Sequence, residues 1–276
     1  DCDNLTYVPD DNFEQALINY NYDDFLDNYV LTSNINEITY LNVAAQEITD
    51  LTGIEDFISL TTLYCDQNEI AALDVSNNVA LERLGVGCTC SSGNLLTELD
   101  VSQNVNLEWL QCEDNKLLNL DISNNTLLTY LGVGQNLLTE LDVSNNPLLE
   151  EVHCGWNPIN ELDFTNKPLL KHLMCYNFPD ATINYLDISI NSELEYLNFG
   201  HNQISEAAIS NKTKLEGLTV SSNPIGSLDL SNMPDLESLL CSNANLTSLD
   251  VTQNSVLNNL HCGNNQIENL DLNNNP

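Results

Sequence analysis

The sequence has very few basic residues. Six Lys and Arg stand against 41 Asp and Glu in 276 residues, which gives a formal net charge of −35. Nucleic-acid binding needs a basic footprint that neutralises phosphates, so this shortage excludes DNA and RNA as partners. Anionic membrane surfaces are disfavoured for the same electrostatic reason. The chain also lacks any run of about 18 apolar residues, so we expect no insertion into a membrane.

Motifs of catalysis are missing as well. The sequence contains no G-x-S-x-G, no phosphate-binding glycine-rich loop and no H-E-x-x-H. The repeats described below predict an open sheet, and such a sheet would not exclude water from a reacting group. The sequence therefore predicts a protein that is not an enzyme and holds no cofactor, apart from the calcium hypothesis given below.

Leucine and asparagine are abundant, with 47 and 43 copies, and 42% of the residues are apolar, so the chain is not a disordered acidic tail. The bias comes from a 21-residue repeat, seen cleanly from Leu107 to Leu127. A degenerate unit of 22 residues begins at Ile38, and the unit from Leu81 gains five residues around 87–93. The unit from Leu170 gains three around 178–182. Other units begin at Leu60, Leu128, Leu149, Leu194, Leu215, Leu236 and Leu257, which makes about eleven coils.

Each repeat predicts one short strand followed by a turn. Apolar and exposed residues alternate in xxLxCx, as in a strand that is buried on one face. An asparagine recurs where the strand must turn, and we expect these side chains to bond backbone groups in a ladder that runs from coil to coil. They are Asn68, Asn115, Asn136, Asn157, Asn202, Asn223 and Asn265. In the second half, LDVSNN, we expect Leu and Val to point inward and the Ser-Asn-Asn turn to point outward.

The first 37 residues lack the repeat and are expected to form a cap. Residues 9–12 followed by Phe13, Leu17 and Tyr20 predict a capped amphipathic helix, and a second short segment at 24–29 is expected beside it. A solenoid needs such a cap over its first hydrophobic layer. Residues 38–276 form the repeat domain, whose last coil is incomplete, so we expect the native chain to be longer.

Six of the nine cysteines occupy one inward position of the repeat, where other coils carry Val or Phe: Cys65, Cys112, Cys154, Cys175, Cys241 and Cys262. The spacing predicts buried free thiols that pack as small apolar groups in a ladder. Cys2, Cys88 and Cys90 lie outside that position, and one disulfide among them is open.

These repeats resemble the internalin-J-like class of bacterial leucine-rich repeats, which carry a cysteine ladder. The unit at 128–147 and the entry segments at 8–13 and 48–54 carry the resemblance. It implies a right-handed leucine-rich-repeat horseshoe, an α/β-type solenoid that is mostly β, with a parallel concave sheet and a small helical cap. It also implies a secreted or cell-surface protein, with its signal peptide already removed, that acts in adhesion or binding.

Aromatic and imidazole residues gather at the strand segments and are predicted to form a binding stripe on the concave face. They are Tyr64, Trp109, Tyr130, His153, Trp156, His172, Met174, Tyr176, Tyr196 and His201, with Tyr40 extending the stripe toward the cap. Rigid aromatic side chains are the usual anchors of binding surfaces. Nearby glycines, such as Gly85, Gly132 and Gly155, are expected to leave accessible space between the rings. The alternative is that these residues have no binding role and that a broad sheet simply tolerates large side chains.

An aspartate follows the same leucine in nine coils: Asp74, Asp100, Asp121, Asp142, Asp163, Asp187, Asp229, Asp250 and Asp271. We expect each to accept backbone N–H bonds in the adjoining turn, and calcium bridging is the alternative. In the cap, Asn19, Asn21 and Asp23 match the first ligand positions of a calcium loop, but Asp24 and Val30 depart from that motif. A metal at His153 and His172 is a further hypothesis.

Together these features predict a monomeric, non-catalytic extracellular recognition module that binds a protein through the concave face. The alternative is a polysaccharide-binding module at the cell surface, because flat aromatic rings also suit sugar rings. An enzyme is the third and weakest hypothesis.

Overall fold

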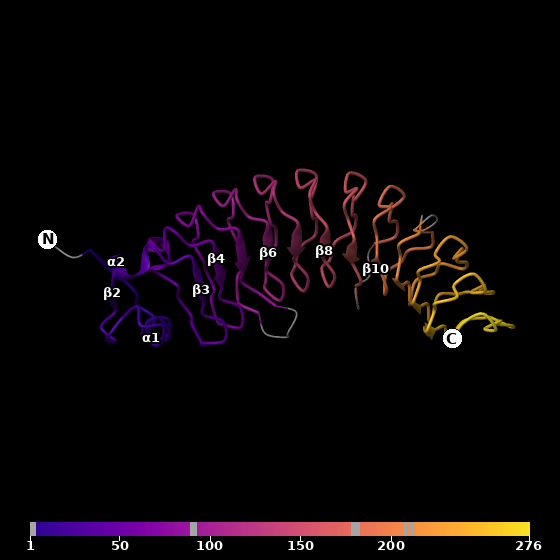
Figure 1. Cartoon of the computed structure of the whole chain (residues 1–276), viewed down its shortest axis with the longest axis horizontal. Helices are drawn as coiled ribbons and strands as arrows, with labels where there is room; N and C mark the ends of the chain where they lie inside the picture. Colours follow the sequence, from indigo (N-terminus) through magenta and orange to yellow (C-terminus); the bar gives the residue numbers. More distant parts are fainter. Residues whose placement is uncertain (1–3, 89–92, 178–182, 207–208, 210–211) are drawn as a thin grey trace. The chain divides into compact units, whose positions relative to one another are not determined.

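The computed structural model describes residues 4–88, 93–177, 183–206, 209 and 212–276. The chain divides into two compact units, Asp1–Leu138 and Thr139–Pro276, which are described separately. Each unit contains a stack of similar turns, and each of these turns contributes one three-residue strand to a parallel sheet (Figure 1).

In the first unit, five parallel strands follow one another in chain order. They are β3 (Tyr40–Asn42), β4 (Thr62–Tyr64), β5 (Arg83–Gly85), β6 (Trp109–Gln111) and β7 (Tyr130–Gly132). The central leucine of each strand is buried and lies in register with the next, as Leu110 does with Leu131. The residues on either side of it face away from the core.

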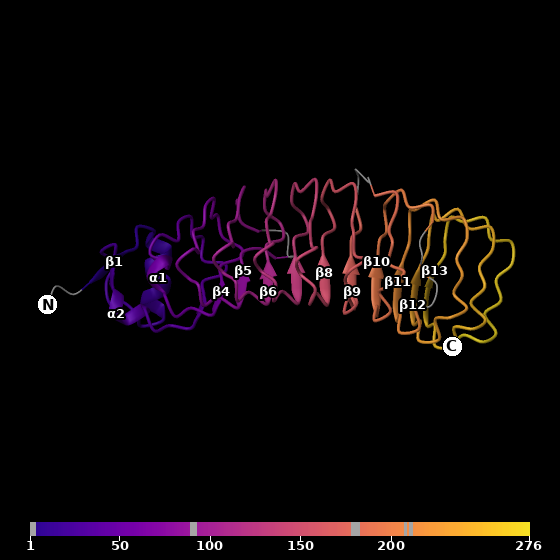
Figure 2. The same ribbon diagram turned by 90° about the horizontal axis from the view of Figure 1, so that it is seen from above.

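The second unit repeats this arrangement with six strands (Figure 2). They are β8 (Glu151–His153), β9 (His172–Met174), β10 (Tyr196–Asn198), β11 (Gly217–Thr219), β12 (Ser238–Leu240) and β13 (Asn259–His261). The prediction of a mostly β leucine-rich-repeat solenoid with about 21 residues per turn is confirmed.

Buried asparagines connect consecutive coils beyond the ends of the strands from β4 onward, as the sequence predicts, although the last of them, Asn265, is partly exposed. The Asn68 side chain accepts from the Gln46 and Ile48 amides at 3.0 Å and donates to the Val43 and Cys65 carbonyls at 2.9 Å. One amide group therefore satisfies four backbone groups of two coils, three of them in buried hydrogen bonds.

A second row of asparagines was expected to point outward and does not. The last residue of the turn is buried in the Ser-Asn-Asn turns that end at Asn78 and Asn125, and its amide donates backward into the preceding coil. Asn104, at the equivalent position of a Ser-Gln-Asn turn, donates to the Val75 and Asn78 carbonyls at 2.9 Å. The turn carbonyls of one coil would otherwise be covered by the next coil without a partner, which is costly.

Three coils replace the buried asparagine of this second row with Lys167, Lys212 or Met233, all at most 1% exposed. Burial lowers the pKa of both lysines, and nearby aspartates oppose that shift. The Lys167 ammonium contacts the Asn166 side chain, and the Lys212 ammonium donates to the Ser189 carbonyl at 3.3 Å.

The repeated aspartates cap their own turns, as expected. In all nine coils the carboxylate accepts a hydrogen bond from the backbone amide two residues later, at 2.8–3.0 Å. Hydrogen bonds from Ser123 lower the pKa of Asp121. In three other coils the equivalent serine lowers the pKa of its aspartate in the same way: Asp74, Asp100 and Asp229. No cation is needed to explain this row.

The cysteine ladder consists of free thiols, as predicted. Cys65, Cys112, Cys154, Cys175 and Cys241 are buried and Cys262 is partly exposed. Burial raises the pKa of the Cys154 and Cys241 thiols to about 12. Cys88 is disulfide-bonded, whereas Cys2 and Cys90 lie outside the described residues.

The cap contains the predicted helix α1 (Asp11–Asn19), in which Asp10 is the N-cap residue and accepts from the Asn12 and Phe13 amides at 3.0 Å. Asp10 also accepts from the Thr49 amide and hydroxyl at 2.8 Å, which ties the cap to the first coil. Residues 24–28 form a loop rather than a separate element. Three elements were not predicted: an antiparallel pair of strands, β1 (Leu5–Tyr7) and β2 (Tyr29–Leu31), and the short helix α2 (Thr32–Ile35). A 3-10 turn, η1 (Ile54–Asp56), precedes β4.

Candidate functional site

The predicted binding residues divide between strands and turns. Those on strands of the exposed sheet face are Tyr64, Trp109, Tyr130, His153, His172, Met174 and Tyr196. Trp156, Tyr176 and His201 were expected in strand segments but lie beyond the strand ends. Trp156 and His201 have left-handed backbones, with φ of 58° and 55°, because the chain turns there before the ladder asparagine.

In the first unit, the aromatic residues form one connected row across four strands. The rings of Tyr40 and Tyr64 lie 6.1 Å apart, those of Tyr64 and Trp109 lie 5.8 Å apart, and Trp109 stacks on Tyr130 at 5.0 Å and 18°. Arg83, from the strand between β4 and β6, lies over the indole at 5.1 Å and donates to the Tyr64 hydroxyl at 3.3 Å.

Both faces of Trp109 are therefore covered. Strand β6 lies between β5 and β7, so Arg83 and Tyr130 approach the indole from opposite sides. Each ring of this row is held by its neighbours, and Tyr64, Trp109 and Tyr130 are only partly exposed. The row is a rigid surface that needs little ordering when it binds a partner.

The glycines do not leave open ground between the rings, contrary to expectation. A Cβ on Gly85 would lie 2.6 Å from the Tyr64 ring, and one on Gly132 would lie 2.8 Å from the Glu113 carboxylate. In the second unit the Tyr196 ring covers Gly217 in the same way, with 2.7 Å to such a Cβ. Large side chains of one coil lean onto the glycine of the next because that space is otherwise empty.

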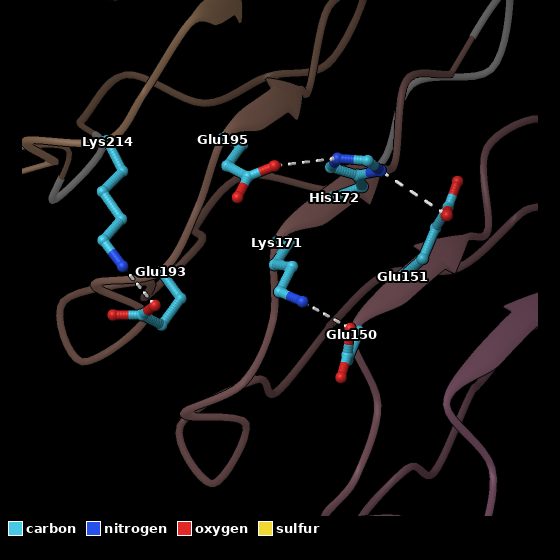
Figure 3. Close-up of polar contacts among 7 residues, drawn as sticks. All are labelled: Glu150, Glu151, Lys171, His172, Glu193, Glu195 and Lys214. Atoms are coloured by element: carbon cyan, nitrogen blue, oxygen red, sulfur yellow. Dashed lines mark hydrogen bonds and ion pairs between the residues drawn. The ribbon is translucent and has the colours of Figure 1, made fainter. Parts of the chain in front are cut away.

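The second unit brings His172 between two carboxylates (Figure 3). Its Nδ1 lies 3.5 Å from Glu151 and its Nε2 lies 3.5 Å from Glu195, one on each neighbouring coil. Glu151 also lies 2.8 Å from the Nε2 atom of His153. The Tyr196 ring meets the His172 imidazole edge-on at 5.1 Å.

Two ion pairs run beside this cluster, which we call the His172 cluster (His172, Glu151 and Glu195). Lys171 donates to Glu150 at 2.6 Å, and Lys214 donates to Glu193 at 2.5 Å (Figure 3). The hydrogen bond to Glu150 raises the pKa of Lys171. Four of the six basic residues of the chain lie in this unit, and two of them are used here.

The predicted binding residues did not include these glutamates and lysines, although Glu151 was expected near His153 and His172. The signal was present, because Glu82, Glu108, Glu150, Glu195, Glu216 and Glu237 recur just before or at the strands. Tyr196 donates to Glu216 at 2.7 Å, and this bond raises the pKa of the Tyr196 hydroxyl.

Two of the predicted binding residues that lie beyond the strand ends, Trp156 and Tyr176, contact each other. Their rings meet edge to face, with centroids 6.2 Å apart.

The structure adds no support to the two metal hypotheses, the calcium loop in the cap and the metal at His153 and His172. Within the described ranges, no group of three or more His, Cys, Asp or Glu side chains could hold a metal ion. Asn19 accepts from Gln15 at 3.2 Å, and Asp23 accepts from the Asp24 amide at 2.9 Å. Asn21 has a left-handed backbone with φ of 62°. The helices in the described part of the chain are too short or too polar to cross a membrane.

Similarity to known proteins was found among solved structures. The functional domain of InlJ from Listeria monocytogenes, which includes a cysteine ladder, is 33% identical over 99% of this chain and 64% of that chain, with a TM-score of 0.80. A leucine-rich repeat protein of Leptospira interrogans is 22% identical over 77% and 57%, with a TM-score of 0.67. The chain thus spans less than two thirds of either protein.

An internalin from Listeria monocytogenes, inlF, shares the fold over 97% of this chain and 92% of that chain, with 23% identity and a TM-score of 0.63. Neither the family models nor the curated proteins gave a match.

Proposed function

We propose that this internalin-like leucine-rich repeat chain, with its ladder of buried cysteines, is a non-catalytic extracellular recognition module that binds a protein through the exposed face of its parallel sheet. The internalin-like fold is consistent with a protein-binding module that is not an enzyme. Secretion or surface display, and a monomeric state, are parts of the same proposal.

The connected aromatic row of the first unit is the observation that carries this proposal. Binding hot spots are rich in Trp, Tyr and Arg, and the row contains all three. Its side chains are held by one another before any partner arrives, so little conformational entropy remains to be lost on binding. Such a surface favours contact with the side chains of a protein.

The covering of Trp109 argues against the polysaccharide alternative. A sugar ring stacks on an open aromatic face, and here Arg83 and Tyr130 occupy the two faces of the indole. A sugar could stack on Trp109 only after one of these neighbours had moved. The indole of Trp109 therefore offers its edge to a partner, which suits packing against protein side chains.

The His172 cluster supports a partner with basic groups in the second unit. Glu151 and Glu195 flank an imidazole that is half-exposed, and the sheet face there carries more acidic than basic side chains. Complementary charge on a partner would speed its association and fix its orientation. We therefore expect binding to weaken as salt concentration rises.

Arrays of purified extracellular proteins and of polysaccharides, probed with the whole chain, test the proposal. For any protein that binds, Trp109→Ala and Gly85→Val should each weaken binding at least tenfold. Gly85→Val displaces the Tyr64 ring without removing an aromatic group. Leu118→Ala, which changes a side chain that is 59% exposed and lies outside the strands, is the matched control.

Two results would refute it. Polysaccharide binding that Trp109→Ala abolishes, with no protein bound, would favour the carbohydrate alternative. Protein binding that survives both sheet-face substitutions would place the contact elsewhere.

A further inference from the structure

The outer face of the β1–β2 pair in the cap is apolar and uncovered. Thr6 and Val30 form the middle pair of this sheet and are buried. The pairs on either side of it point the other way, so Leu5, Tyr7, Tyr29 and Leu31 share one face and are 56%, 50%, 45% and 36% exposed. The side of a two-stranded sheet that faces water normally carries polar residues.

These four side chains form a connected patch, which we call the cap patch. Leu5 is paired with Leu31 and Tyr7 with Tyr29, and the two tyrosine rings lie 5.4 Å apart. Scattered exposed apolar residues need no explanation, but contiguous ones mark interaction sites. The loop that leads into β2 adds two more exposed apolar residues, Phe25 and Leu26.

The segment that carries the cap patch, residues 1–37, has charged side chains of one sign only. Residues 1–37 contain nine Asp and Glu and no Lys or Arg, and the first basic residue of the chain is Arg83. Asp27 lies two residues before the start of β2, and its carboxylate accepts from the Tyr29 amide at 3.1 Å. A ligand of this patch must therefore supply apolar groups for the centre and positive charge for the surroundings.

We propose that the cap patch docks a segment of another protein that carries apolar side chains together with Lys or Arg. Charge complementarity selects this occupant. A second copy of the chain would bring a cap segment of the same negative charge to the contact, and anionic lipid would be repelled in the same way. This surface is separate from the sheet-face residues proposed above, so either proposal can fail without the other.

Three labelled peptides test the proposal by fluorescence anisotropy with the whole chain: one of alternating Leu and Lys, one of alternating Leu and Glu, and one of alternating Ser and Lys. The Leu-Lys peptide should bind at least tenfold more tightly than either of the others. The double substitution Tyr7→Ser and Leu31→Ser should weaken that binding at least tenfold. Leu118→Ser with Leu137→Ser, which changes two leucines that are 59% and 49% exposed in the same unit, should leave it within twofold.

The controls keep the test decisive. Leu5→Lys retains a strand-compatible side chain and adds a repelling charge, so it should weaken the Leu-Lys peptide even if the double variant does not fold. Equal loss in the cap and control variants would mean that the peptide binds the acidic surface at large, which overturns the proposal. Concentration-dependent dimerisation through these residues, or cosedimentation with phosphatidylcholine vesicles that Leu5→Lys abolishes, would overturn it in favour of a second copy or a membrane.

Discussion

Replacing Asn68 by alanine should destabilise the protein strongly, although it removes only one amide group. The side chain is 5% exposed and makes four good hydrogen bonds, two from the Gln46 and Ile48 amides and two to the Val43 and Cys65 carbonyls. A net contribution of about 0.5–1.5 kcal/mol for each bond gives a loss of roughly 2–6 kcal/mol. That is a large part of the stability of an ordinary domain, which is about 5–15 kcal/mol.

Urea unfolding followed by circular dichroism measures this loss, and Asn77→Ala is the matched control. Asn77 is the exposed neighbour of a buried ladder residue, so its substitution should cost less than about 0.5 kcal/mol. Hydrogen exchange should show faster exchange at residues 46–48 in Asn68→Ala, because the Gln46 and Ile48 amides lose their acceptor. A cost below about 1 kcal/mol with unchanged exchange there would refute the idea that the amide holds the two coils together.

Three further predictions concern single residues. Hydrogen bonds from Ser123 lower the pKa of Asp121 in the folded protein. The ionised carboxylate therefore stabilises the fold at a pH above the pKa that Asp121 has in the unfolded chain, and this contribution is lost as the pH falls through its pKa in the folded protein. The melting temperature of Asp121→Ala should therefore lie below that of the wild type at pH 7, and the gap should close in acid; a constant gap would contradict this. At pH 8 the buried Cys154 thiol should not react with a thiol reagent in the native protein, whereas the partly exposed Cys262 should react, as mass spectrometry of labelled peptides can show. Lys167→Met should increase the free energy of unfolding or leave it within about 1 kcal/mol of the wild-type value, because Met233 already fills the equivalent position in another coil. A loss above about 2 kcal/mol in urea unfolding would contradict this.

The fold was predictable because the repeat specifies each coil independently. The alternation around Leu110 fixes a strand with one buried face, and the recurring asparagine after it fixes the turn. The second buried row could not be read from the pattern, because Ser-Asn-Asn is also a typical exposed turn. Burial of Asn104 depends on carbonyls of the preceding coil, which no local pattern reveals.

The strand positions of several candidate residues were predictable from the sequence, but their contacts were not. Strand spacing correctly places Trp109 and Tyr130 on neighbouring strands. It does not show that Arg83 closes over the indole, or that Tyr64 leans onto Gly85, because those contacts depend on side-chain rotamers. The position of Trp156 failed for a backbone reason, since the left-handed turn before the ladder asparagine interrupts the alternation.

The asparagine ladder also bears on how such a chain can change its length during evolution. Asn136 donates to Val133, three residues before it, and to Cys112 in the preceding coil. Asn94 makes the same two kinds of bond, to Val86 and Cys65 at 2.8 and 2.9 Å, although it lies eight positions after Val86 and not three. The join between coils thus depends on where the amide ends up and not on how many residues lead to it. Duplication of a whole coil adds one more identical joint, and an insertion between strand and asparagine leaves the existing joint intact.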